Sequence, residues 1–344
     1  MRTKKTDSAA VKKGVSPVLL FWAKHEALIL AVLAALAIVF PLIFTEKYIM
    51  NLAVLAIIFA ILAVSLNLLT GCLGIASIGH AAFMALGAYT AALLVMRLNT
   101  SFFVAFLVAI VVTSLFGALL CLPTLRLNSR YLTIVTLAFC ELIRIVLTNW
   151  QSLTRGPMGL PAIPKMEFFG YTFRGMLPNY YFALGVLVIA LLIIHNLMNS
   201  SMGRAITAIK NDPVAAEAMG VKITSHKLLV FVLSAALAGV AGAFYAFFIG
   251  FIDPSSFSFD TSVQILSMVI LGGLGNMYGS VFSAIVLTAL PEILRPLLSL
   301  RQVLYGALLT LIVILRPKGL LGSVNLKHLR QQHGMDGKKR KERK

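Results

Sequence analysis

Charged residues are scarce in this sequence, and acidic ones especially so. Aspartate and glutamate together number 12 among 344 residues, and all charged residues make up 12% of the chain, against roughly 25% in an ordinary soluble domain. Hydrophobic residues make up 59%. This composition excludes an ordinary soluble protein and indicates a polytopic membrane protein.

The sequence also lacks the motifs that most catalytic or metal sites require. Its three cysteines, Cys72, Cys121 and Cys140, lie in or beside apolar runs and form neither a metal-binding spacing nor a disulfide framework. The phosphate-binding loop G-x-x-x-x-G-K-[ST] does not occur, so the chain cannot be its own P-loop ATPase. The six histidines and the scattered carboxylates form no recognisable catalytic cluster. We therefore expect no enzyme activity, no bound cofactor and no metal site.

Long apolar runs recur along most of the chain. Several approach the roughly 20 residues that a helix needs to cross a bilayer, whereas the last ones are shorter and leave re-entrant or tilted segments open. We expect an all-α polytopic membrane protein with about ten transmembrane helices, eight being the alternative. The apolar runs span residues 27–44, 48–69, 81–96, 102–122, 131–150, 180–198, 228–252, 263–271, 281–294 and 303–315.

The formal net charge of +18 is concentrated at the two ends of the chain. A basic tail, residues 1–26, precedes the transmembrane domain, residues 27–322, and a second basic tail, residues 323–344, follows it. By the positive-inside rule both termini are cytoplasmic, which requires an even number of spans. We expect solvated tails, with attraction to anionic membrane lipid as an alternative, and no binding of nucleic acid.

Under this topology the loop of residues 199–227 lies in the cytoplasm. Asp212 is a suitable N-cap, Pro213 suits the first helical position, and Gly220 can adopt the left-handed conformation that ends a helix. The sequence therefore predicts a short helix over residues 213–219. Such a helix is marginal alone in water, where about 12–15 residues are needed, so we expect it to dock on a soluble partner. A well-capped loop without a partner is the alternative.

Four glycines interrupt the membrane-like segment of residues 65–89. Backbone that leaves a helix at membrane depth is tolerated only where it is buried in protein or lines a watery cavity. One hypothesis is therefore a translocation path along Gly74, Ser77, Gly79 and His80. The other is close helix packing through small residues, with the histidine bonding across helices.

Glu141 and Arg144 lie three residues apart in the apolar run of residues 131–150, on one face of a helix. We expect them to form an intramembrane ion pair. Ionisable groups at this depth usually face the bundle interior or water, which favours a functional role. A pair that only fixes helix register is an equal alternative.

Two further glycine-rich segments separate apolar runs. Residues 153–164 fall outside under the same topology and either meet a delivery protein, cap a pore or simply connect two spans. Residues 271–279 read as a tight cytoplasmic turn or a broken helix. They are no nucleotide-binding fingerprint, because no soluble strand precedes them.

Strings along residues 50–322 resemble, in order, the permease subunits of branched-chain amino-acid ABC transporters of the LivM type. A chain of strings in order is far more specific than one motif. The strings are Ser65-Leu-Asn-Leu-Leu, Ser77-Ile-Gly-His-Ala-Ala-Phe, Gly87-Ala-Tyr-Thr-Ala-Ala, Ile134-Val-Thr-Leu-Ala-Phe, Ala215-Ala-Glu-Ala-Met-Gly, Ser234-Ala-Ala-Leu-Ala-Gly-Val-Ala-Gly-Ala, Pro254-Ser-Ser-Phe-Ser-Phe, Leu271-Gly-Gly-Leu-Gly and Arg316-Pro-Lys-Gly-Leu-Leu-Gly.

The resemblance implies an importer subunit of type II-like fold in a bacterial inner membrane. A second, H-type permease would complete the pore, two cytoplasmic ATPase subunits would drive it with ATP, and a periplasmic binding protein would deliver substrate. Residues 213–220 then look like the coupling helix, in which Ala216, Glu217 and Gly220 match the family's alanine–glutamate–glycine loop and Asp212 and Pro213 begin the helix.

The sequence departs from the family pattern at several positions beside the expected path and outer loop. Ile75, Arg155 and Met158 replace a glutamine, a glycine and an asparagine, and Asn128 with Ser129 replaces an arginine–glycine step. The substrate therefore stays open between branched-chain or related amino acids and the urea or short amides of sister systems. An ion-coupled secondary transporter is a less favoured alternative.

Overall fold

The computed structural model describes residues 26–44, 46–124, 129–168, 171–173 and 175–293, with the single positions 306, 310, 314 and 319. The chain divides into two compact units, Met1–Thr45 with Ser323–Lys344, and Glu46–Gly322. In the first unit, α3 (Glu26–Ile43) coincides with the first expected apolar run. The basic tails lie almost wholly outside the described residues.

The second unit is built from helices that coincide with the other expected apolar runs. The long helices are α4 (Lys47–Asn67), α5 (His80–Leu98), α6 (Phe102–Thr124), α7 (Ser129–Asn149), α9 (Met176–Asn199), α12 (Ile223–Ile249), α13 (Phe259–Gly272) and α14 (Met277–Ile293). The short helices are η1 (Leu68–Cys72), α8 (Gln151–Thr154), η2 (Gly156–Met158), α10 (Ser201–Asn211), α11 (Pro213–Ala218) and η3 (Pro254–Phe257). An antiparallel hairpin of two-residue strands, β1 (Glu167–Phe168) and β2 (Tyr171–Thr172), lies between α8 and α9.

Six helical segments in the described part of the chain are long and apolar enough to cross a membrane. The helices α13 and α14 are apolar but shorter, as the sequence indicated for the late runs. Apart from the small hairpin, the prediction of an all-α polytopic membrane protein is confirmed. The last expected run, residues 303–315, lies mostly outside the described residues, so the choice between ten and eight spans stays a prediction.

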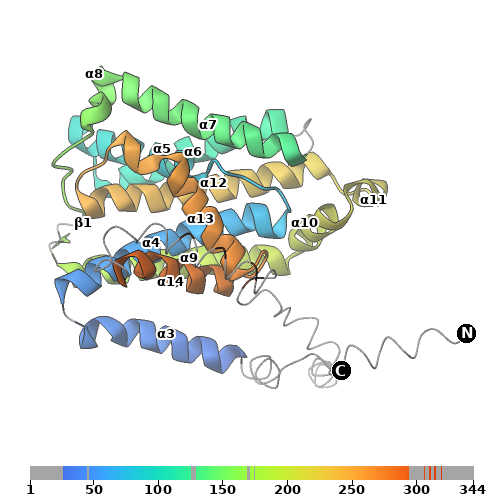
Figure 1. Ribbon diagram of the computed structural model, residues 1–344, viewed down its shortest axis with the longest axis horizontal. Coiled ribbons are helices and arrows are strands. Elements are labelled where there is room, and N and C mark those ends of the chain that lie inside the picture. Colours follow the sequence, from blue (N-terminus) through green and yellow to red (C-terminus); the bar gives the residue numbers. More distant parts are fainter. Residues whose placement is uncertain are drawn as a thin grey trace, which may run out of the picture. The chain divides into compact units, whose positions relative to one another are not determined.

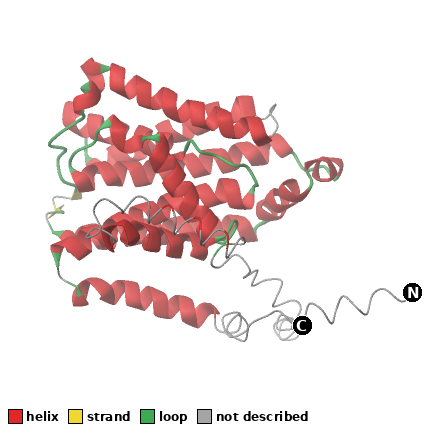
Figure 2. Cartoon of the chain, viewed as in Figure 1, coloured by secondary structure: helices red, strands yellow, loops and turns green. Residues whose placement is uncertain are grey.

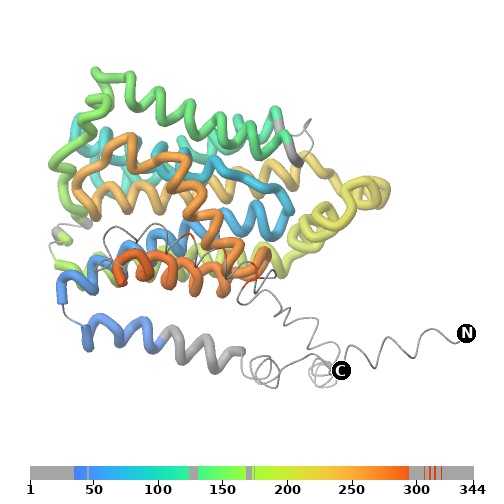
Figure 3. Tube along the Cα trace, in the orientation of Figure 1, coloured from blue at the N-terminus to red at the C-terminus, as the bar shows by residue number. Residues whose placement is uncertain are grey.

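Connections of the second unit gather at two opposite ends of its bundle. The helix α8 and the β1–β2 hairpin lie at one end, and α10 with α11 projects from the other (Figure 1). Figure 2 shows the loops, in green, mostly at these ends. The segment that joins η1 to α5 differs, because it turns back from the α10 end into the bundle, as the blue tube of Figure 3 shows.

The core sits where α12 packs against α4, α5 and α6. Small residues allow the backbones to approach closely there. A Cβ atom on Gly242 would lie 1.9 Å from the carbonyl oxygen of Met84, and one on Gly87 would lie 2.2 Å from that of Gly239. Transmembrane helices associate through such small-residue contacts because lipid gives them no hydrophobic driving force. Close packing therefore accounts for the glycine at position 87.

This contact predicts that Gly242→Ala lowers the thermal unfolding temperature in detergent. The added methyl group would force α12 away from the α5 backbone, and overpacking of this kind costs about 1–3 kcal/mol or more. Gly185→Ala on α9 is the matched control, because a Cβ there meets nothing within 4 Å. Alanine is the better helix former by about 1 kcal/mol, so the control should be neutral or stabilising. Equal losses in both variants would contradict this account.

Candidate functional site

The loop between α9 and α12 folds as two short helices, α10 and α11, which we call the coupling hairpin (residues 201–218). Ser200 caps α10 by accepting a hydrogen bond from the Gly203 amide at 3.4 Å. Gly203, Ile206 and Ile209 are the buried residues of α10. The sequence analysis missed this helix, although a serine N-cap followed by buried positions three residues apart is a readable signal.

The expected capping chemistry holds for α11. The Asp212 carboxylate oxygen Oδ1 accepts the amides of Val214 and Ala215, each at 3.0 Å, and Pro213 occupies the first turn. Gly220 has a φ of +83°, the left-handed conformation that favours glycine. The helix ends at Ala218, one residue earlier than predicted, because the Gly220 amide bonds back to Glu217 at 2.9 Å and tightens the last turn.

Most of α11 is uncovered by the rest of the chain. Ala216 is its buried residue, whereas Glu217 and Gly220 are exposed. Val214 and Met219 are 78% and 84% exposed, an unusual state for apolar side chains that lie so close together. Ala216 is therefore the residue through which α11 packs on the rest of the chain, and Val214 and Met219 stay uncovered by the described residues.

The segment between α4 and α5 (residues 68–79), here called the re-entrant segment, contains the residues expected along a translocation path. It begins as the π-helix η1, a form often found at functional sites. Gly74 follows at a φ of +81° and is exposed, whereas Ser77 and Gly79 are buried and lead into His80, the buried first residue of α5. The four path residues therefore belong to one continuous stretch of chain.

Side chains from other helices satisfy the backbone of the re-entrant segment. The Thr136 hydroxyl accepts the Ile78 amide at 3.1 Å, and the Thr133 hydroxyl donates to the carbonyl of Ala76 at 3.2 Å. Gly79 has no room for a side chain, because a Cβ there would lie 2.4 Å from the Thr136 carbonyl oxygen. The irregular backbone of this segment is thus hydrogen-bonded to side chains of α7 and is not left unpaired.

His80 is wholly buried and lies 2.6 Å from the Ser65 hydroxyl, from Nε2 to Oγ. The next amide, that of Ala81, donates to the Ser262 hydroxyl of α13 at 3.1 Å. Ser65 in turn offers its carbonyl to the Ser234 hydroxyl of α12 at 2.7 Å. The start of α5 is therefore bonded directly to α4 and α13 and, through Ser65, indirectly to α12, and the contact of His80 with Ser65 is of the cross-helix kind that the packing hypothesis invokes.

Asn67 is a buried polar residue that the sequence reasoning did not single out. Its side chain donates to the Ser280 hydroxyl of α14 at 2.9 Å and accepts the amide of Gly275 at 2.8 Å. These bonds join the end of α4 to the turn between α13 and α14, where Gly275 has a φ of +88°. Its place in the string that begins at Ser65 was the signal available.

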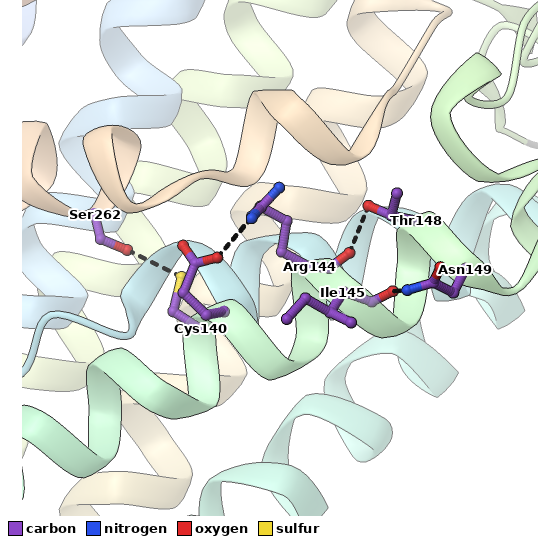
Figure 4. A network of polar contacts seen from close by, with 7 residues as sticks. Cys140, Arg144, Ile145, Thr148, Asn149 and Ser262 are labelled. Atoms are coloured by element: carbon purple, nitrogen blue, oxygen red, sulfur yellow. Dashed lines mark hydrogen bonds and ion pairs between the residues drawn. The ribbon is translucent and has the colours of Figure 1, made fainter.

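Glu141 and Arg144 lie together on α7 as expected for an ion pair. Both Nε and Nη2 of the guanidinium are 2.8 Å from the carboxylate oxygen Oε2. Figure 4 shows Arg144 along α7 beside Thr148, with Cys140 facing Ser262 of α13. The two charged side chains are 38% and 33% exposed, so the pair sits on a face that this chain leaves partly uncovered.

The glycine- and proline-rich residues 153–164 are fastened at the end of the bundle opposite the coupling hairpin. Leu160 and Ile252 exchange backbone hydrogen bonds of 2.8 and 3.2 Å. Arg97 donates to the carbonyls of Ser152 and Leu153. Hydrogen bonds therefore hold this segment to the rest of the bundle, and the choice among its three expected roles stays a prediction.

The positions that depart from the family pattern now have a structural setting. Arg155 has a φ of +60°, a left-handed conformation that glycine adopts without strain, which explains why glycine suits this site. Met158 is 83% exposed, and Ile75 is buried. Asn128 lies outside the described residues.

Asp253 supplies a fixed negative charge beside the fastened loop. Partial burial opposes ionisation, but hydrogen bonds from the side chains and amides of Ser255 and Ser256 outweigh it and hold the pKa of the Asp253 carboxyl below its usual value. Across the described ranges, no three of the His, Cys, Asp and Glu residues are grouped so that they could hold a metal ion.

The model of the family described as branched-chain amino acid transport system / permease component matches residues 48–315. The high-affinity branched-chain amino acid transport system permease proteins LivM of Salmonella typhimurium and of Escherichia coli are each 34% identical, over 86% of this chain and 75% of theirs. The corresponding LivH protein of Salmonella typhimurium is 26% identical, over 77% of this chain and 91% of its own length. No solved structure gives a significant match.

The bonds to α7 predict that Thr136→Val destabilises the re-entrant segment. Valine keeps the shape of threonine but leaves the Ile78 amide without its acceptor, which costs about 1–3 kcal/mol for a buried group. Hydrogen exchange of residues 73–79 should quicken. Thr136→Ser should restore protection, and Thr148→Val, whose hydroxyl bonds within α7, should leave the segment unchanged. Unaltered exchange in Thr136→Val would refute the role of this hydroxyl.

Proposed function

The chain belongs to the family of branched-chain amino acid transport permease components, and we propose that it is a membrane-spanning subunit of an ATP-driven, binding-protein-dependent importer. The observation that carries the proposal is α11, a capped helix whose apolar side chains are exposed at one end of a membrane bundle. The chain's own sequence contains no phosphate-binding loop. In this proposal the energy for transport comes from separate ATPase subunits.

We propose that the ATPase docks on the coupling hairpin. Val214 and Met219 would fill an apolar groove on that partner, while Asp212, Pro213 and Gly220 fix the ends of the helix and Ala216 seats it. Glu217, also exposed, would meet the partner at the rim. A short helix with both ends capped transmits force as one body, which is what a docked lever requires.

The translocation path is proposed to follow Gly74, Ser77, Gly79 and His80. Broken helices at membrane depth form substrate sites in many transporters because their free backbone groups bind polar ligands. Here those groups are taken up by hydroxyls of α7 and α13, and Ser77 and His80 are buried. In this proposal the described state is closed at that point and opens when the surrounding helices move.

A second permease subunit, of the LivH kind, is proposed to cover α7. Apolar residues of α7 such as Ile134 and Leu142 are 64% and 56% exposed, and the partly exposed Glu141 and Arg144 lie on the same helix. Ions facing lipid are costly. A second subunit would remove the pair from lipid, and the pair would fix the register of α7 at the interface.

The proposed setting is a bacterial inner membrane crossed ten times, in a type II-like importer fold. Both termini and the loop of residues 199–227 would be cytoplasmic, and residues 151–179 would face a periplasmic binding protein. The placement of α8 and of the coupling hairpin at opposite ends of the bundle supports this topology. So does the basic charge of residues 1–26 and 323–344.

Branched-chain amino acids are the proposed substrates, since the LivM relatives carry that substrate in their names. In proteoliposomes holding both permeases and the ATPase subunits, uptake of radiolabelled leucine into the vesicles should require ATP in the vesicle lumen, on the side of the ATPase subunits. It should also require binding protein in the outside medium. Urea should not compete. Leucine uptake by this chain alone, driven by a pH gradient, would show an ion-coupled transporter instead.

Docking is tested by Met219→Arg. Placing a charge in an apolar groove should cut co-purification of the ATPase subunits and coupled uptake by about tenfold or more, the loss expected when a buried charge is left unpaired. Met158→Arg is the matched control for co-purification of the ATPase subunits, because its side chain is equally exposed at the other end of the bundle. Normal co-purification of the Met219 variant would remove the docking role of this surface.

Gly220→Val tests the end of the same helix. A β-branched residue resists the left-handed conformation at a cost of about 1–2 kcal/mol, although the space beside Gly220 is open. We expect the spans to stay folded and the amount of leucine transported per ATP to fall. Gly220→Asn, which tolerates this conformation, should be milder. If both variants transported as much leucine per ATP as the unaltered chain, the conformation at position 220 would not affect coupling.

A further inference from the structure

A single lysine joins the coupling hairpin to the re-entrant segment. Lys210 lies near the end of α10, two residues before the N-cap of α11. Its ammonium nitrogen Nζ donates to the carbonyl oxygen of Gly71 in η1 at 2.5 Å, across 139 residues of sequence. The two partners belong to the two functional parts of the protein, the surface that meets the ATPase and the segment that lines the path.

The lysine meets the end of a helix where a cation is favoured. The last carbonyls of the α4–η1 helix lack intrahelical partners, and the helix dipole places partial negative charge there. An ammonium that donates to such a carbonyl makes a charge-assisted bond, which is stronger than a neutral one. The stem of Lys210 also lies against Gly74, since a Cβ there would be 3.1 Å from the lysine Cγ.

The backbone at Gly71, which accepts this hydrogen bond, has little room to move. A Cβ on Gly71 would lie 1.8 Å from the Asn67 side-chain oxygen and 2.3 Å from the Gly275 amide nitrogen, so the backbone is hemmed in on that side. Asn67 bonds to Gly275 and Ser280. A displacement of Gly71 is therefore passed to the turn between α13 and α14 as well as along the re-entrant segment.

We propose that Lys210 is a positioning residue that transmits movement of the coupling hairpin to the gate formed by the re-entrant segment. The inference rests on the proposed function and adds a specific route to it. When the ATPase moves α11, α10 moves with it, and the lysine carries Gly71 and Gly74 along. Loss of this bond separates ATP hydrolysis from opening of the path while leaving docking intact.

The competing route runs through the chain itself. The hairpin is continuous with α9 and α12, and α10 also packs against both of these helices. If those spans carry the motion, the bond from Lys210 to Gly71 is dispensable. Removing only the ammonium of Lys210 distinguishes the two routes, because it breaks the first route and leaves the second intact.

The experiment uses the full transporter in proteoliposomes and measures leucine uptake and ATP hydrolysis together. Lys210→Met keeps the length and apolar character of the stem but removes the donor. We expect assembly and ATP hydrolysis to persist and leucine transported per ATP to fall by about tenfold, the factor that corresponds to one charge-assisted hydrogen bond. Lys210→Arg keeps a donor and should retain most of the coupling. Arg204 is exposed on the same helix, as Lys210 is, so Arg204→Met removes a charge from α10 without touching the bond to Gly71 and should behave as the unaltered chain.

Chemical rescue keeps the test decisive if Lys210→Met assembles poorly. In Lys210→Cys, assembled and then treated with bromoethylamine, alkylation of the thiol with loss of bromide rebuilds a lysine-like side chain. The native cysteines, Cys72, Cys121 and Cys140, are buried, and the unaltered transporter treated in the same way controls for their reaction. Restored coupling after treatment supports the proposal.

Unchanged leucine uptake per ATP in Lys210→Met would overturn the inference, as would a loss that neither arginine nor aminoethylation restores. Either result would leave the proposed function standing, because the unaltered transporter would still take up leucine with ATP. If the proposed function were wrong, the result would be different, because the unaltered transporter would then show no ATP-dependent uptake at all.

Discussion

The fold depends on one requirement, that backbone leaving a helix inside an apolar bundle must find hydrogen-bond partners within the protein. The re-entrant segment after α4 meets it by drawing on distant parts of the chain. Hydroxyls of Thr133 and Thr136 come from α7, an ammonium comes from α10, and an asparagine at the end of α4 holds the turn before α14. The segment is therefore bonded to α7 and to α10, while Asn67 beside it is bonded to the turn before α14 and to α14 itself, an arrangement that suits the proposed gate.

The local features of this chain were predictable because local chemistry decides them. Asp212 followed by Pro213 specifies the start of α11 by capping alone, and Gly220 specifies its end to within a residue. Apolar runs of sufficient length likewise specify the helices that cross the bundle. The pairing of Glu141 with Arg144 follows from helical spacing on a single helix. None of these features requires knowledge of what packs against what.

The features that the sequence could not specify are those made between distant segments. The bonds from Asn67 to Gly275 and from Lys210 to Gly71 span 208 and 139 residues. No periodic pattern of apolar residues in the sequence indicates either bond. The helix α10 was missed because its short amphipathic pattern directly follows a fully apolar span. The resemblance to a permease family suggested the coupling role proposed for the loop of residues 199–227, whereas the contact between that loop and the re-entrant segment came only from the arrangement in space.

The glycine contacts among α5, α6 and α12 bear on how such a molecule changes shape. Where carbonyl oxygens and Cα atoms meet directly, no layer of pliable side chains lies between the helices to absorb sliding. The helices α5 and α12, whose backbones meet in this way, consequently behave as a stiff pair. In the proposed importer, the rearrangement that alternates access would therefore fall on the helices around this pair.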